Sequence, residues 1–278
     1  MQQKSATTKM KGGIMKTLSN PLLKFDTYID IKTAMSQQAY PIVLNGCVDS
    51  QKAHFIPNLG EDFPCRIVLT YKEDKAKELY DMLTQEGLSV RMFKADVSKI
   101  EEANALVNYT IGQFENIDVL INNAGISKPC LFTDISYEQW NEVISTNLNS
   151  VFYVTKKVLQ YMLPNCSGHI INISSMWGLV GGSSEVDYSA SKAGMIGLTK
   201  ALAKELAPSH ISVNGISFGV IDTEMNRCFD EEERAALSEE IPYGRFASPE
   251  EAAAFCYQIT ESPEYLTGQI IRFDGGWI

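Results

Sequence analysis

The sequence lacks several features that would assign the chain to a broad class. Its 278 residues contain no run of about 18 apolar residues, so we expect no membrane span. The opening stretch, MQQKSATTKMKGG, has no apolar core, so we expect no secretory signal and interpret residues 1–19 as a flexible tail. The six cysteines form no CxxC pair, which favours reduced thiols in a cytoplasmic protein.

Metal ligands and basic patches are also scarce. The three histidines, His54, His169 and His210, have no second histidine or cysteine at metal-ligand spacing, so we predict no metal site. Asp and Glu outnumber Lys and Arg by 34 to 24, which gives a formal net charge of −10. The lysines are scattered and form no stripe, and an acidic surface repels phosphate backbones. We therefore expect no nucleic-acid partner.

Short apolar runs alternate with amphipathic segments of helix length along most of the chain. Apolar runs without polar alternation are typical of strands covered on both faces, and a strand-helix-strand repeat predicts a parallel sheet with helices on both sides. We predict an α/β fold: one Rossmann-like domain at 20–278 with a doubly wound, parallel, seven-stranded sheet, right-handed crossovers and an extra N-terminal helix at 20–38. The predicted strands are 41–46, 65–71, 89–96, 117–125, 168–175, 211–217 and 268–276, and the predicted helices are 50–58, 73–86, 99–114, 136–162, 186–207 and 248–260.

Polar residues gather around the predicted strand ends in the second half of the chain. Tyr188 and Lys192 are four residues apart on a predicted helix and so share a face. Ser175 ends a predicted strand thirteen residues before the tyrosine, and Asn147 lies 28 residues before that serine. The segment NNAG, residues 122–125, closes another strand. In open α/β sheets ligands bind at the carboxyl ends of strands, so this edge is the predicted site.

With these motifs the chain resembles the short-chain dehydrogenases/reductases. The resemblance covers roughly 85–278 and includes the NNAG strand end, the Asn-Ser-Tyr-Lys tetrad, the turn SFGVIDT and the ending IPYGRFASPEEAA…YLTGQIIRFDGGWI. Within the family the chain is most similar to bacterial 3-oxoacyl-(acyl-carrier-protein) reductases of fatty acid biosynthesis. The stretch SSMWGLVGGSSEV also resembles the reductases that finish a lysine modification on elongation factor P. The implied activity is NAD(P)H-dependent ketone reduction.

The resemblance implies a role for each tetrad residue. Tyr188 is the implied proton donor; a free tyrosine has a pKa near ~10, and a lysine ammonium on the same helix face is expected to lower it toward neutrality. Lys192 is also implied to hold the nicotinamide ribose, Ser175 to bind the substrate carbonyl, and Asn147 to anchor a water that restores the proton. The implied cofactor contacts are Gly46, Asp96, Val97, Asn123, Ala124, Gly125, Tyr188, Lys192, Gly219, Ile221 and Thr223.

The stretch VLNGCVDSQKAHF, residues 43–55, lacks glycines that the family has. A TGxxxGxG turn brings the backbone close to the pyrophosphate, but Ser50 and Lys52 stand at the second and third glycine positions. Gly46 and Lys52 keep the spacing of a P-loop, although Gln51 and Ala53 replace its second glycine and its hydroxyl. On these residues alone, an ordinary strand-helix turn with a polar N-cap is the simpler interpretation.

A second resemblance concerns the first part of the chain. Residues 15–83 are similar to the start of bacterial transcription-repair coupling factor, a helicase-like module with a decayed P-loop. A chimera is implied, with 20–83 from a degenerate P-loop module, 84–278 from a reductase, and the join between about 64 and 86. The alternatives are an active reductase, a folded chimera with little catalysis, and, with weaker support, a module for DNA-repair partners.

The sequence gives weaker indications of the coenzyme, the substrate and the oligomeric state. Lys72 and Lys75 follow the second strand, and no acidic residue ends it, which favours NADP over NAD. Carrier-protein reductases have arginines beside the site entrance at places that match Cys166 and Ser209, so a small ketone or the elongation-factor branch stays open. We predict a substrate lid at 224–245. The helices at 136–162 and 186–207 and the C-terminal strand predict a homotetramer or homodimer.

We predict that restoring glycine at positions 50 and 52 strengthens NADPH binding. A helix N-terminus still attracts the pyrophosphate, but Ser50 and Lys52 carry side chains where the family has hydrogen. The parent chain should therefore bind NADPH more weakly than low-micromolar affinity, about 8 kcal/mol. Fluorescence titration of the parent and the Ser50→Gly/Lys52→Gly variant measures the difference. Equal affinities in two folded proteins would show that this loop is not the limiting defect.

Overall fold

The computed structural model describes residues 41–45, 66–71, 80–81, 84–85, 89–226 and 229–278. The chain divides into two units, Met1–Ala39 and Tyr40–Ile278, and only the second contains described residues. The helix predicted at 20–38, the glycine-poor turn that begins at Gly46, and the lysines that favour NADP lie outside the described residues.

The described strands form one parallel sheet in the order β3-β2-β1-β4-β5-β6-β7. The chain order reverses direction between β1 and β4, which creates the switch point where ligands bind in open α/β sheets. A Rossmann-like α/β fold with a doubly wound parallel sheet is therefore confirmed. The strands are β1 (Pro41–Asn45), β2 (Arg66–Tyr71), β3 (Ser89–Lys94), β4 (Val119–Asn122), β5 (Gly168–Ser175), β6 (Ile211–Phe218) and β7 (Ile270–Phe273).

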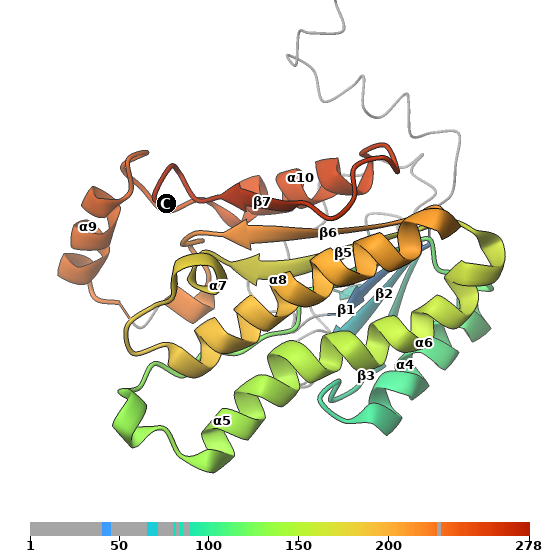
Figure 1. The fold of residues 1–278 in the computed structure, drawn as a ribbon, viewed down its shortest axis with the longest axis horizontal. Coiled ribbons are helices and arrows are strands. Elements are labelled where there is room, and N and C mark those ends of the chain that lie inside the picture. Colours follow the sequence, from blue (N-terminus) through green and yellow to red (C-terminus); the bar gives the residue numbers. More distant parts are fainter. Residues whose placement is uncertain (1–40, 46–65, 72–79, 82–83, 86–88, 227–228) are drawn as a thin grey trace, which may run out of the picture. The chain divides into compact units, whose positions relative to one another are not determined.

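Two apolar clusters cover the two faces of the sheet. Helices α4 (Ile100–Phe114), α6 (Ser150–Asn165) and α8 (Val186–Leu206) lie side by side across one face (Figure 1) and bury residues such as Leu106, Val158 and Ile170. On the other face, α10 (Pro249–Thr260) packs Cys256 and Ile259 against β4, β5 and β6. Every residue of β6 is buried, including the polar Ser212, Asn214 and Ser217, as expected of a strand covered on both faces.

Three of the seven described α-helices begin at a side chain that satisfies free backbone N–H groups. Ser136 accepts a hydrogen bond from Gln139 N at the start of α5 (Tyr137–Ile144). Capping boxes open α9 (Glu231–Glu240), at Asp230, and α10, at Ser248. The remaining short elements are α7 (Trp177–Val180) and three 3₁₀ turns, Phe132–Asp134, Ala207–Ser209 and Glu224–Asn226. None of the described helices is both long and apolar enough to cross a membrane.

The single helix predicted at 136–162 is divided in the structure. It consists of α5, a π-helical segment at Ser145–Asn149, and α6, which continues to Asn165. The apolar pattern runs through all three parts, so the sequence did not reveal the wider turn between them. Large apolar side chains stay exposed along α5 and α6, including Tyr137, Trp140 and Phe152. This surface fits the predicted homo-oligomer, which stays a prediction.

A chain of buried polar side chains links the central strands to the helices above them. The Asn122 amide on β4 donates to Thr155 Oγ1 on α6 at 3.1 Å and to Asn172 Oδ1 on β5 at 2.8 Å. The Asn172 amide donates in turn to Thr199 Oγ1 on α8 at 2.9 Å. All four residues are buried, so each hydrogen bond replaces one that water supplies in the unfolded chain.

We predict that Asn172→Ala lowers the free energy of unfolding by about 2–4 kcal/mol. The substitution leaves the buried Asn122 amide without one acceptor and the buried Thr199 hydroxyl without its donor, and it opens a small cavity. The matched control is Asn165→Ala, because Asn165 makes an amide-amide hydrogen bond at an exposed position and should change stability by less than about 0.5 kcal/mol. Chemical denaturation of both variants measures the difference, and equal costs would contradict the role of the buried chain.

Candidate functional site

The predicted tetrad comes together at the carboxyl edge of the sheet. The arrowheads of β5 and β6 point toward α7 and the start of α8 (Figure 1). Ser175 is the last residue of β5, and Tyr188 and Lys192 lie in the first two turns of α8. Asn147 reaches the same place from the π-helical segment, because its amide donates to Ser191 Oγ, beside Lys192, at 3.1 Å.

Lys192 is a buried cation at the centre of this group. Its side chain is 3% exposed, and its Nζ donates to the carbonyl of Ile173 on β5 at 2.7 Å. The backbone carbonyl of Lys192 accepts a hydrogen bond from Ser174 Oγ at 3.2 Å, so β5 holds both ends of the residue. Burial lowers the pKa of the Lys192 ammonium to about 8, since the charged form loses hydration.

Two glycines make room for Lys192. A Cβ at Gly178 on α7 would lie 2.8 Å from the Lys192 carbonyl carbon, so any side chain there would collide with the backbone of α8. A Cβ at Gly125, after β4, would lie 3.4 Å from Lys192 Nζ and 3.5 Å from Asn147 Oδ1. Gly125 belongs to the NNAG motif, whereas no sequence signal pointed to Gly178.

The Tyr188 phenol differs from its predicted state. Burial raises the pKa of Tyr188 to about 12, and a hydrogen bond with Ser175 lowers it only in part. Lys192 Nζ lies 5.6 Å from the centre of the Tyr188 ring, and it donates a hydrogen bond to the carbonyl of Ile173. The expectation that the lysine brings the tyrosine pKa toward neutrality is therefore wrong for this arrangement, because desolvation of the phenolate outweighs the distant charge.

Asn147 makes a different contact from the predicted one. Its Oδ1 accepts from the N–H of Ile126 at 2.8 Å, and its Nδ2 donates to the carbonyl of Ile126 at 2.9 Å. With the bond to Ser191, both N–H groups of the amide donate to protein groups, so the side chain holds the loop after β4. The expected role of Asn147 in anchoring a water stays a prediction.

Two carboxylates beside Tyr188 were missed by the sequence analysis. Glu185 is the N-cap residue of α8 but accepts a hydrogen bond from Ser127 Oγ at 2.6 Å instead of capping the helix. Burial raises the pKa of the Glu185 carboxyl, and its negative charge contributes to the raised pKa of Tyr188. Asp187 is fully buried and accepts from Gln139 Nε2 at 3.0 Å. Both residues lie within three positions of Tyr188, which was the available sequence signal.

The comparisons with known proteins agree with this geometry. The sequence profile described as short chain dehydrogenase matches residues 59–234. The chain belongs to the short-chain dehydrogenase family. It is similar to acetoacetyl-CoA reductase of an Acinetobacter strain, with 41% identity over 75% of this chain and 85% of the relative. It is also similar to 3-oxoacyl-(acyl-carrier-protein) reductases of Thermotoga maritima, with 39% identity over 74% and 85%, and of Chlamydia trachomatis, with 40% over 69% and 78%.

This short-chain dehydrogenase has residues that fit the nicotinamide end of NAD(P)H, the cofactor of its family. Gly125 leaves a space bordered by Lys192 Nζ and Asn147 Oδ1, and a side chain would fill this cradle. Asn123 is exposed beside the buried Ala124, so the strand end presents polar atoms at the same edge. Tyr188 and Lys192 lie on the adjoining helix, where the resemblance puts contacts to the ribose.

The other predicted cofactor residues that the structure describes lie in two segments, one after β6 and one before α4. Ile221 and Thr223 follow β6 at the carboxyl edge, and Ile221 pairs with Ala247 in an isolated parallel bridge. A Cβ at Gly219 would lie 2.9 Å from Asp274 Cα, so this glycine is needed for packing on the C-terminal segment. Asp96 Oδ1 accepts from Ser98 Oγ at 2.6 Å in the turn before α4, and Val97 is buried. Gly46 lies outside the described residues.

The two positions that match the carrier-protein arginines lie far from the tetrad of the same chain. Cys166 ends α6 just before β5, and Ser209 ends the 3₁₀ turn just before β6. Both residues therefore lie at the amino edge of the sheet, opposite Ser175 and Phe218. A strand of eight residues spans roughly 25 Å, so neither position borders the entrance in the same chain.

We predict that Lys192 makes the stability of the protein increase with pH between about 8 and 10. The folded pKa is about 8 and the unfolded pKa is near 10.4, so in this window the unfolded chain binds more protons and a rise in pH favours the folded state. The slope for one proton approaches about 1.4 kcal/mol per pH unit. Denaturation of wild type and Lys192→Met across this range measures it, with Lys200→Met on the same helix as the control. A slope shared by wild type and Lys192→Met would contradict the prediction.

Proposed function

We propose that this protein is an NADPH-dependent reductase of ketones, of the 3-oxoacyl reductase type. The observation that carries the proposal is the convergence of Ser175, Tyr188 and Lys192 at the carboxyl end of β5, next to the space left by Gly125. A phenol, a hydroxyl and an ammonium at one strand edge are the groups that carbonyl reduction requires, since the developing alkoxide needs both a proton and hydrogen-bond donors.

The residues of this chain would act on the carbonyl oxygen. Ser175 Oγ lies within reach of the Tyr188 phenol, so both hydroxyls can donate to one carbonyl oxygen between them. Tyr188 then transfers its proton as the oxygen gains charge. Its pKa of about 12 keeps the phenol protonated at neutral pH, which suits a proton donor in the reductive direction. Lys192 supports the phenolate that remains after the transfer.

NADPH would supply the hydride when it is bound, with its nicotinamide ribose near Tyr188 and Lys192. We propose NADP over NAD because Lys72 and Lys75 follow β2 and suit a 2′-phosphate. We also propose that the cofactor binds weakly, since Ser50 and Lys52 replace family glycines and residues 15–83 resemble a different parent. The family profile begins at residue 59, which leaves this loop outside the matched range.

The negative charge near Tyr188 affects which substrates can approach it. Two relatives are named for acetoacetyl-CoA and for an acyl carrier protein, and both kinds of substrate carry phosphate. Glu185 and Asp187 surround Tyr188 with negative charge, and the chain has a net charge of −10. We propose that a ketone without nearby anionic groups reacts best, which includes the elongation-factor branch. Coulomb repulsion disfavours a phosphorylated chain at this entrance.

We predict that Tyr188→Phe reduces NADPH-dependent reduction of a neutral β-keto ester by about a hundred-fold or more. The substitution removes the proton donor, and general acid catalysis contributes about 10²–10⁴-fold. Tyr161→Phe is the matched control, because Lys157 lies over its ring at 5.8 Å with the same four-residue separation on α6, away from the site. The oxidation of NADPH, followed by its absorbance, measures both variants.

The control variant should retain wild-type activity within about two-fold, because Tyr161 is half-buried on α6 and lies away from the tetrad. Equal turnover by wild type and Tyr188→Phe would show that the tyrosine donates no proton in the measured reaction. A wild type that binds NADPH but reduces no ketone would favour the alternative of a folded chimera with little catalysis.

A further inference from the structure

Helix α9 is attached to the domain with little apolar contact. None of its residues is buried, and five of its ten are glutamates, so a hydrophobic face does not dock it. The half-exposed side chains Arg234, Leu237 and Ser238 form its inner stripe at helical spacing, followed by the buried Ile241 just after the helix. Arg234 is the only cation of the helix and begins this stripe.

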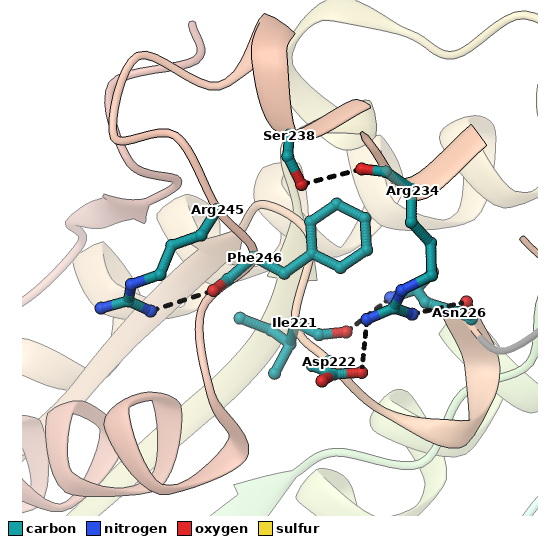
Figure 2. Close-up of polar contacts among 7 residues, drawn as sticks. All are labelled: Ile221, Asp222, Asn226, Arg234, Ser238, Arg245 and Phe246. Atoms are coloured by element: carbon teal, nitrogen blue, oxygen red, sulfur yellow. Dashed lines mark hydrogen bonds and ion pairs between the residues drawn. The ribbon is translucent and has the colours of Figure 1, made fainter. Parts of the chain in front are cut away.

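Arg234 makes three contacts across the base of the lid segment, 224–245 (Figure 2). Its guanidinium donates to Asp222 Oδ1 at 3.0 Å and to the carbonyl of Asn226 at 3.5 Å. The same guanidinium lies 4.8 Å from the centre of the Phe246 ring, which is 8% exposed. One side chain of α9 thus contacts both the chain that leads into the lid and the chain that leaves it.

The hydrogen-bond partners of Arg234 belong to the segment that follows β6 at the carboxyl edge. The Ile221 carbonyl accepts from Thr223 N at 2.8 Å and from Asn226 Nδ2 at 2.7 Å (Figure 2). Asp222 N donates to the carbonyl of Ala247 at 2.9 Å, next to Phe246. Asp222 lies between Ile221 and Thr223, the two residues expected to border the nicotinamide. Its backbone is therefore fixed on one side by Ala247 and its carboxylate on the other by Arg234.

We propose that Arg234 is a positioning residue: with Asp222 and Phe246 it clasps α9 onto the segment 221–223, so that docking of the lid and binding of NADPH support each other. The proposal rests on the proposed function for its cofactor half. By linkage, if docking of α9 strengthens NADPH binding by a given factor, bound NADPH strengthens the docking of α9 by that same factor. An ion pair that is partly exposed and a cation–π contact together suit a reversible clasp, because each is modest in energy.

A second arginine in the same region provides a matched control. Arg245 forms an ion pair with Glu251 at 2.7 Å, donates to the Phe246 carbonyl at 2.9 Å and lies 5.0 Å from the Tyr243 ring. Its ion-pair partner is on α10, and none of its contacts reaches α9 or Asp222. Arg245→Met removes an ion pair and a cation–π contact of similar kind without breaking the clasp.

The test compares Arg234→Met, Asp222→Asn and Arg245→Met with wild type. Amide hydrogen exchange in the absence of cofactor should be about three- to ten-fold faster across α9 in the first two variants and unchanged within about two-fold in the third. NADPH titration by fluorescence should show affinity reduced in the first two variants only, by at most about the same three- to ten-fold factor. Arg234→Lys keeps the charge but loses the planar stacking, so it should fall between wild type and Arg234→Met.

A double-variant cycle separates the clasp from general destabilisation. In Asp222→Asn/Arg234→Met, the α9 amides should exchange no faster, and NADPH should bind no more weakly, than in Arg234→Met alone. The reason is that either change already breaks the ion pair. Unchanged exchange of α9, or an equal loss in Arg245→Met, would overturn the proposal. If wild type binds no NADPH, the proposed function and the cofactor half of this proposal both fail, whereas faster exchange limited to the Arg234 and Asp222 variants still supports the docking of α9.

Discussion

The burial of one ammonium group is the constraint on which the site depends. A lysine removed from water must regain hydrogen bonds or lose its charge, and Lys192 finds the Ile173 carbonyl. The remaining space around it is defined by glycines, since Gly178 touches its backbone and Gly125 approaches its Nζ. A strand, a short helix and a loop therefore all come close to one side chain. Tyr188, one turn earlier on α8, is positioned as a consequence.

The Asn147 amide connects this centre to the rest of the domain. It satisfies both backbone groups of Ile126, so the loop after β4 is held without regular pairing of its own. A π-helical segment carries Asn147, and such segments are frequent at functional sites because they reorient one side chain within a helix. The wider turn directs Asn147 toward Ser191 and so joins the α5–α6 chain to α8.

The sequence was sufficient for much of the fold because parallel strands are buried on both faces. Isoleucine-rich runs such as 168–175 and 211–217 therefore marked strands to within a residue, and the tetrad followed from its spacing. The division of the helix at 145–149 was not predictable, since apolar periodicity continues through it. The state of Tyr188 depends on burial by distant segments, which no local pattern encodes.

The place of Cys166 and Ser209 in the fold was predictable from the sequence. Cys166 and Ser209 directly precede strands, and a residue before a parallel strand lies at the amino edge of the sheet, opposite the site. Glu185 and Ser127 are separated by 58 positions, so their contact was not visible in the sequence, although both flank recognised motifs. Motif spacing thus identified the groups that react, whereas the residues that set their charge environment became apparent only in three dimensions.

The helices of this domain are held in place in two different ways. The helices over the sheet are fixed by buried apolar faces and by the polar chain through Asn172, and such contacts open only with global unfolding. Helix α9 has no buried residue and depends on Arg234 for much of its attachment. Because a partly exposed ion pair costs little to break, α9 can detach while the sheet and the tetrad stay intact. Helix α9 is therefore weakly attached, whereas buried contacts fix the elements that carry Tyr188 and Lys192.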